Sequence, residues 1–295
     1  MRTSERAVRG RSTAELGPVE RRALARLVAG ARFELIPLAG ALEQAEALPP
    51  GAPTSVTASP SRGIWPTVEL AAALARRGHP SAPHLAAHMV RDRGHLGELL
   101  AACREAGLTE AFIVGGDAKE AGEFADGLAL LRAIRELGGP FERLGVPGYP
   151  QGHPQIPEDV LQRALLAKAP LASWVTTQMC FEPAAIAAWI GRIREAGVEL
   201  EVHLGVPGAV ELGRLLAVSA RIGLADAARY LRKNRSVLGR LARGSFGPDG
   251  LLEALAPTIA RPAARVRGLH VFTFNQVASA VAWQRAMLEA LAEGS

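Results

Sequence analysis

The feature that most constrains the fold of this chain is a regular alternation of short β-rich runs with longer amphipathic helical stretches. The runs are Arg32–Leu38, Thr54–Ser59, Ala82–Met89, Ala111–Gly116, Glu142–Tyr149, Ser173–Phe181, Glu199–Val206 and Leu269–Phe274. Strands separated by helices are expected to be parallel, because parallel neighbours need a crossover connection. About eight such units favour a closed (β/α)8 TIM barrel over an open doubly wound sheet. No GxGxxG sequence follows the first run, which argues against a dinucleotide-binding fold.

Helical stretches separate these runs, and glycines mark their ends. The stretches include Thr67–Arg77, His95–Ala106, Ala125–Leu137, Asp159–Lys168, Ala184–Ala196 and Val210–Ile222. Glycines that follow helical stretches are Gly78, Gly107, Gly138, Gly197 and Gly223. Glycine readily adopts the left-handed conformation that ends a helix, so these positions support the predicted boundaries.

Two segments lie outside this alternation. Residues 1–30 are predicted to form a polar arm and a short helix, Pro18–Val28, ahead of a barrel domain over residues 31–295. Residues 224–268 are predicted to be a helical insertion between the seventh and eighth strands, with helices at Asp226–Ala242 and Leu251–Ala260. The basic run Arg229–Arg235 within it is either a solvated helix face or the border of an anionic ligand.

Composition and charge narrow the class of protein. The 295 residues are 48% hydrophobic, enough for a filled core, and their 34 Lys and Arg against 29 Asp and Glu give a net charge of +5. There is no basic stripe with interleaved aromatics and no apolar run of membrane-spanning length, so neither nucleic acid nor a membrane is an expected partner. Cys103 and Cys180 lack the spacing of a zinc site or a disulfide framework. We therefore expect a cytoplasmic protein that acts on a small molecule, and leave open whether it forms a homo-oligomer.

Polar residues follow nearly every predicted strand, at the end where a barrel of this kind carries its active site. They are Glu34, Thr57 with Ser59, His84 with His88, Asp117, Tyr149 through His153, Gln178, His203, and Thr273 with Asn275. Because parallel strands of a barrel all end at the same face, these side chains are expected to gather around one mouth.

Glu34 and Asp117 are the acidic candidates for catalysis. Glu34 lies between apolar residues, so burial is expected to raise its pKa and suit it to general acid catalysis. The alternative is a carboxylate at the barrel floor that pairs with an arginine. Asp117 follows Gly115 and Gly116, which allow the backbone to approach a ligand closely.

Other mouth residues suit a flat heterocycle rather than a metal. Tyr149 and His153 flank prolines that stiffen their loop, and Gln178 is expected to be a buried amide that both donates and accepts hydrogen bonds. His84 and His88 are poorly spaced for a shared metal, with His203 as the obvious third ligand, so we predict no metal site. The absence of a GxSxG sequence leaves acyl transfer without support.

Seven short segments resemble, in the same order, motifs of the bacterial single-barrel methylenetetrahydrofolate reductases. They are Arg32–Pro37, Ser55–Thr57, Pro83–Leu85, Val114–Asp117, Tyr149–Pro154, Thr177–Phe181 and Phe272–Asn275, within a region from Phe33 to about Trp283. The chain looks like a divergent, actinobacterial-like member of that family. The resemblance implies that Glu34 protonates N5 of the folate and that Asp117 stabilises the resulting iminium cation. It further implies that Gln178 and Phe181 contact the pterin, with Leu212 near a position where the family has an aromatic residue.

The resemblance also implies FAD as cofactor and NADH or NADPH as hydride donor. The residues expected around the cofactor are Thr57, His84, Gly116, Asp117, Tyr149, His153 and, near its phosphates, Lys168. Gly115 stands where the family has the arginine of an Arg-Gly-Asp motif, which removes one flavin contact.

Three alternatives stay open at this point. The first is a flavin-independent reductase that passes hydride directly from NADH to the pterin. The second is an enzyme that recycles one-carbon groups from a demethylation pathway. The third is a degenerate barrel that binds folate or flavin without catalysis, which the presence of Glu34 and Asp117 disfavours.

Overall fold

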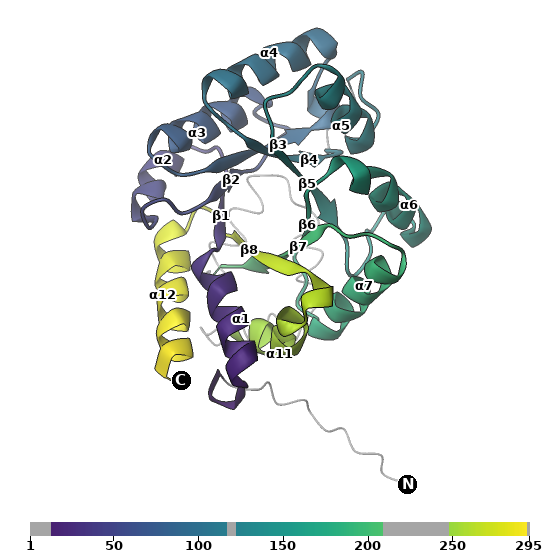
Figure 1. Ribbon diagram of the computed structural model, residues 1–295. Helices are drawn as coiled ribbons and strands as arrows, with labels where there is room; N and C mark the ends of the chain where they lie inside the picture. The colour runs from purple at the N-terminus through teal and green to yellow at the C-terminus, as the bar shows by residue number, and fades with distance from the viewer. Residues whose placement is uncertain (1–12, 117–121, 209–247, 294–295) are drawn as a thin grey trace.

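The computed structural model, which describes residues 13–116, 122–208 and 248–293, contains a closed barrel of eight parallel strands (Figure 1). The strands pair in chain order, and β8 closes the barrel on β1. They are β1 (Arg32–Leu35), β2 (Thr54–Val56), β3 (Ser81–Ala86), β4 (Glu110–Val114), β5 (Arg143–Gly148), β6 (Trp174–Thr177), β7 (Glu201–Pro207) and β8 (Val266–Phe272). The predicted (β/α)8 barrel is confirmed.

Helices surround the barrel, as the alternation of the sequence predicts. The longer ones are α1 (Pro18–Ala29), α3 (Trp65–Arg76), α4 (Arg93–Glu105), α5 (Gly127–Glu136), α6 (Glu158–Lys168), α7 (Pro183–Glu195), α11 (Asp249–Ala260) and α12 (Val277–Glu293), and a single turn forms α2 (Ala41–Gln44). The predicted helices that fall within the described residues start and end within about two residues of these bounds. Predicted helices 210–222 and 226–242, and the basic run 229–235, lie outside the described residues.

The strand boundaries depart from the prediction mainly at the carboxyl ends. β3 stops at Ala86 and continues as a short 3-10 turn over Ala87–Met89, and β6 stops at Thr177. β8 begins at Val266, so three residues predicted to close the helical insertion belong to the strand. Gly268 pairs with His203 of β7, and Arg267 lies at an irregularity of this pairing, between the paired residues Val266 and Gly268.

Helix α1 belongs to the outer layer of the barrel. Figure 1 shows it beside β8, between α11 and α12, and it contacts both helices. Its apolar face buries Leu24, Leu27 and Val28. From α12, the amide of Gln284 donates to the Val28 carbonyl oxygen at 2.7 Å, which satisfies a carbonyl group at the end of α1.

Aromatic and imidazole rings fill the inside of the barrel. The His84 ring on β3 lies 4.8 Å from Phe112 on β4 and 6.2 Å from His270 on β8, measured between centroids. β4 and β8 are not neighbours, yet Phe112 and His270 lie 6.5 Å apart, so these rings meet across the lumen. Barrels of this class usually fill the lumen with branched aliphatic side chains. The side chains that fill this lumen are instead aromatic rings and titratable imidazoles.

Two glycines make room for the largest of these rings. A Cβ on Gly145 would lie 2.2 Å from the Trp174 ring, and one on Gly268 would lie 2.4 Å from the His203 ring. Trp174 and His203 stack with centroids 5.4 Å apart. Large and small residues on neighbouring strands therefore interlock, as close packing requires.

An ion-pair network closes the floor, at the amino ends of the strands. Arg32 pairs with Glu110, and Arg143 bridges Glu110 and Glu201. The Arg143 guanidinium also lies 5.4 Å from the centroid of the Trp174 ring, within range of a cation–π contact. The floor is thus occupied by paired charges, at the face where this fold places stability rather than catalysis.

Within the described residues, Cys103 and Cys180 are both buried and free, which confirms the prediction of no disulfide framework. No helix in this part of the chain is long and apolar enough to cross a membrane.

The substitution Gly145→Ala is expected to destabilise the fold by about 1–3 kcal/mol, because the new Cβ overlaps the Trp174 ring in a packed lumen. The matched control is Gly191→Ala in α7, where a Cβ would meet no heavy atom within 4 Å. That change is expected to stabilise the protein by about 0.5–1 kcal/mol through helix propensity. Urea unfolding followed by circular dichroism measures both. Equal stability of Gly145→Ala and the wild type would contradict the interlocked packing.

Candidate active site

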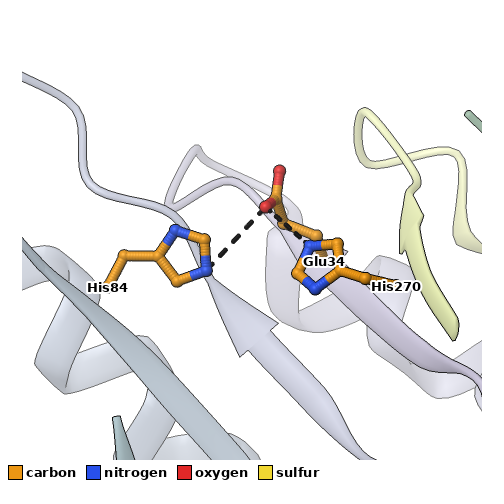
Figure 2. Close-up of side chains that lie close together, drawn as sticks. All are labelled: Glu34, His84 and His270. Carbon is orange, nitrogen blue, oxygen red and sulfur yellow. Dashed lines mark hydrogen bonds and ion pairs between the residues drawn. The ribbon is translucent and has the colours of Figure 1, made fainter. Parts of the chain in front are cut away.

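The carboxylate of Glu34 lies between two imidazoles in the upper part of the lumen (Figure 2). Its Oε2 is 3.0 Å from His270 Nε2, a hydrogen bond, and 3.8 Å from His84 Nε2. The Glu34 side chain is 14% exposed, whereas His84 and His270 are buried. The three residues come from β1, β3 and β8, so only closure of the barrel brings them together.

The loop after β8 fixes the backbone at Glu34. The Thr273 hydroxyl donates to the Glu34 carbonyl oxygen. The Asn275 side chain bonds both backbone groups of Ile36, accepting from its N–H at 2.8 Å and donating to its carbonyl at 2.9 Å. Asn275 itself has a φ of 58°, a left-handed conformation that asparagine tolerates better than most residues. Thr273 and Asn275 were predicted among the polar residues at the barrel mouth, and the structure shows that they hold the carboxyl end of β1.

The electrostatic environment of Glu34 differs from the predicted one. Burial disfavours the charged carboxylate and acts to raise its pKa, as the sequence suggested. The hydrogen bond from His270 and the charges of His270 and His84 outweigh this effect, so the pKa of Glu34 lies below its ordinary value. The predicted upward shift was wrong, because it left out two imidazoles from distant strands. Among the residues that the structure describes, Glu34 pairs with no arginine, and Arg32 pairs with Glu110 at the floor.

His84 is an unsatisfied group that faces the same carboxylate. Burial lowers its pKa from 6.5 to about 4, which makes the ring neutral at physiological pH. Its buried Nε2 has no hydrogen-bond partner among the described residues. A buried polar atom of this kind normally has a partner, so the atom is available to a bound ligand.

The metal candidates considered from sequence do not come together. His88 Nε2 lies 2.9 Å from the Ala125 carbonyl oxygen, and His203 stacks on Trp174 near the floor. His203 was predicted at the mouth, but it is the third residue of β7 and lies four residues before the strand ends. Among the described residues, the ligand-type atoms that approach one another within 4.8 Å belong to Glu34, His84 and His270. Glu34 and His270 are already joined by the 3.0 Å hydrogen bond, in which a proton lies between the carboxylate and the imidazole.

The residues predicted around a cofactor lie at the carboxyl ends of β2 to β5 and on α6. Thr57 follows β2, and its backbone N–H donates to Leu35 O at 2.9 Å. Gly116 follows β4 with a φ of 93°, and a Cβ there would lie 3.0 Å from the Ala86 Cβ, so the backbone needs glycine. His84, on β3, lies in the lumen as described above.

Tyr149, His153 and Lys168 form the outer part of this region. The Tyr149 and His153 rings meet edge to face with centroids 5.4 Å apart. Tyr149 and Lys168 line one cavity of about 60 Å³ between β5, α6 and α7. Burial lowers the pKa of Lys168, which the charge of Asp126 partly opposes.

The structure describes only some of the residues that were predicted to bind or act on the substrate. Gln178 directly follows β6, and its backbone N–H donates to Gly148 O at 2.7 Å. Its side chain is exposed, so the prediction of a buried amide was wrong. Phe181 is half-buried just beyond it. Asp117 and Leu212 lie outside the described residues.

His270 is the site residue that sequence reasoning missed. It lies in the middle of β8 rather than at the strand end, where the candidates were sought. The alternation of Gly268, His270 and Phe272 with Leu269 and Val271 is the signal that places it in the lumen, because successive side chains of a strand point to opposite faces.

Fold and site together define a (β/α)8 barrel that gathers titratable side chains toward the carboxyl ends of its strands, the architecture of barrel enzymes. A family model for methylenetetrahydrofolate reductase matches residues 56–214, which is more than half of the chain. The chain belongs to the methylenetetrahydrofolate reductase family, and the resemblance seen in its motifs is confirmed.

Solved structures with a similar barrel are much more distant. A "putative phosphonomutase" from Burkholderia cenocepacia J2315 is 14% identical, with 91% of this chain and 97% of that chain covered and a TM-score of 0.45. A "putative deoxyribose-phosphate aldolase" from Toxoplasma gondii ME49 is 13% identical, with 92% and 97% covered and a TM-score of 0.48. Likeness at this level carries no argument about function.

Stability is expected to fall as the pH drops from 6.5 to about 4, because the unfolded His84 takes up a proton that the folded one does not. For a single group shifted this far, the loss approaches about 3 kcal/mol. His84→Gln cannot take up that proton and is expected to lose less over the same range. Glu34, whose pKa is lowered from 4.5, adds its own loss of stability only below about pH 4.5, so the comparison is cleanest between pH 6.5 and 5. Urea unfolding at several pH values measures the two slopes, and equal slopes would contradict a neutral His84.

Proposed function

We propose that the protein reduces 5,10-methylenetetrahydrofolate to 5-methyltetrahydrofolate, with NADH or NADPH as hydride donor and FAD as cofactor. Membership of the family supports a folate-dependent oxidoreductase. The observation that carries the specific reaction is Glu34, a carboxylate fixed at the backbone by the β8 loop and reaching the mouth beside two imidazoles. It stands in the segment that resembles the motif carrying the acid of the family.

The side chains around the mouth would each have a defined part in this reaction. Glu34 would donate a proton to N10 of the folate; the bond between N10 and the bridging carbon would break with its electron pair going to N10, and the lone pair of N5 would form the iminium cation. By resemblance, Asp117 would stabilise that cation. Gln178 can donate and accept hydrogen bonds at the edge of the pterin, and its exposed amide is free to reach a ligand.

The residues on the other side of the mouth fit a flavin. The unpartnered Nε2 of His84 offers it a hydrogen bond, and the Tyr149–His153 pair offers an aromatic wall. Lys168 lines the same cavity as Tyr149, and its cation would suit the phosphates of the cofactor, as the family resemblance implies. When bound, the flavin supplies hydride transfer between the nicotinamide and the folate, while the barrel residues orient it and exclude water.

A second candidate is direct hydride transfer from NADH to the pterin. Gly115, which replaces the arginine of the family's motif, favours it, because one expected flavin contact is missing. Both candidates use Glu34 in the same way and differ only in what carries the hydride.

The purified protein is expected to oxidise NADH or NADPH when methylenetetrahydrofolate is present, with 5-methyltetrahydrofolate detected by mass spectrometry. Turnover that needs added FAD, together with flavin absorbance of the reconstituted protein, supports the first candidate. Equal turnover without FAD supports the second. No turnover under either condition would refute the proposed reaction.

Within the same assay, Glu34→Gln is expected to lower folate reduction by about 100-fold or more, since the proton transfer is lost. With flavin bound, oxidation of NADH by a quinone acceptor should persist, because that step needs no proton from Glu34. The matched control is Glu46→Gln, whose side chain is 71% exposed, and it should behave as the wild type. Full folate reduction by Glu34→Gln would exclude Glu34 as the acid.

A further inference from the structure

We propose that Glu34, His84 and His270 form a binding site for a divalent transition-metal ion such as Zn²⁺, and that this ion and folate exclude each other. The ion site follows from the three side chains alone, whereas its effect on catalysis rests on the proposed function. The prediction of no metal site was made for His84 with His88 and His203. Closure of the barrel instead brings His84 to Glu34 and His270.

The donor atoms of the three side chains have the spacing of metal ligands. All of them lie within 4.8 Å of one another. Glu34 Oε2 is 3.0 Å from His270 Nε2 and 3.8 Å from His84 Nε2. Bonds of about 2.0–2.2 Å to a tetrahedral zinc ion put neighbouring ligand atoms about 3.3–3.6 Å apart, between the two observed distances. Figure 2 shows the two imidazoles on either side of the carboxylate, each with a nitrogen toward the same oxygen.

Two buried polar atoms in this part of the lumen lack a hydrogen-bond partner among the described residues. One is Nε2 of His84, whose residue is 6% exposed, and the other is the hydroxyl oxygen of Ser55. Ser55 lies opposite Glu34 in the register of β1 and β2, so its side chain faces the lumen as well. Buried polar atoms normally have partners. A hydrated metal ion can supply both: a ligand bond for the nitrogen and a hydrogen bond from bound water for the hydroxyl.

The donor set selects the kind of ion. Two imidazole nitrogens and a carboxylate oxygen suit Zn²⁺ and related transition metals, whereas Mg²⁺ and Ca²⁺ prefer oxygen ligands. A ligating nitrogen must be free of its proton, so His270 carries its proton on Nδ1 in the metal-bound state. Arg32, two residues before Glu34, has its charge paired with Glu110, which weakens its repulsion of a cation.

The ion and the proposed reaction need the same atoms. A carboxylate that binds a metal is deprotonated, so Glu34 cannot donate a proton to the folate while the ion is bound. The ion also takes up Nε2 of His84, which in the proposed reaction offers a hydrogen bond to the flavin. Zinc therefore converts the protein into an inactive form, and a chelator that removes the ion restores the acid.

Calorimetric titration of the chelator-treated whole chain with ZnCl₂ tests the site. We expect one ion per chain, bound at least about 100-fold more weakly by His270→Gln, because loss of groups that only orient a metal ligand already costs about 10–100-fold. The matched control is His88→Gln, which removes a histidine outside the cluster and should bind zinc as the wild type does. A wild type that binds no zinc, or a His270→Gln variant that binds it as tightly, would overturn the proposal.

A measurement on the wild type alone covers the case in which His270→Gln does not fold. X-ray absorption by the protein loaded with one equivalent of zinc is expected to show two imidazole ligands, with oxygen completing the shell. A shell that contains sulfur would place the ion at Cys103 or Cys180 and overturn the proposal. So would a shell without imidazole.

The effect on catalysis is measured in the folate-reduction assay. One equivalent of Zn²⁺ is expected to abolish turnover, EDTA to restore it, and excess Mg²⁺ to leave it unchanged. Full turnover by protein whose zinc site is filled would overturn the mutual exclusion. Absence of turnover in the metal-free wild type would instead refute the proposed function, whether or not zinc binds.

Discussion

The barrel closes where β8 pairs with β1, and the side-chain hydrogen bonds across this seam are what the site depends on. Phe272 lies opposite Glu34 in the strand register, and the residues just after it bond the backbone of Glu34 and Ile36. Two residues earlier in β8, His270 bonds the Glu34 carboxylate itself. The seam therefore fixes both the backbone and the charge of the same residue. A barrel that closed in another register would keep its helices and lose this arrangement.

The titratable groups inside the barrel differ between the floor, at the amino ends of the strands, and the upper lumen, near their carboxyl ends. At the floor, Arg32, Arg143, Glu110 and Glu201 neutralise one another around the Trp174 ring. Higher up, Glu34 has imidazoles as neighbours in place of arginines, and an imidazole gives up its proton near neutral pH whereas a guanidinium does not. The separation keeps permanent positive charge away from the carboxylate. It also explains why a lumen this polar can be stable, since its buried charges are paired.

The sequence predicts the barrel well because the signals for it are local. Hydrophobic periodicity and helix-ending glycines act within a few residues, and the predicted helices accordingly fall close to the observed bounds. The pairing of Glu34 with His270 spans 236 residues, so no spacing in the sequence reveals it. The predicted direction of the Glu34 pKa shift was wrong for the same reason. The prediction that His203 lies at the mouth was also wrong, because β7 extends four residues beyond it. Gln178 was expected to be buried because its neighbours in β6 are, but the strand ends before it.

The proposed reaction requires that the Glu34 carboxylate at the β1–β8 seam meets the reacting nitrogen of a reduced folate. A crystal structure of the protein with 5-methyltetrahydrofolate tests it most directly. We predict the pterin in the barrel mouth, with N10 of the folate within about 3.2 Å of a Glu34 oxygen or one water away from it. Folate bound outside the mouth, or a pterin turned so that Glu34 faces none of its nitrogens, would contradict it.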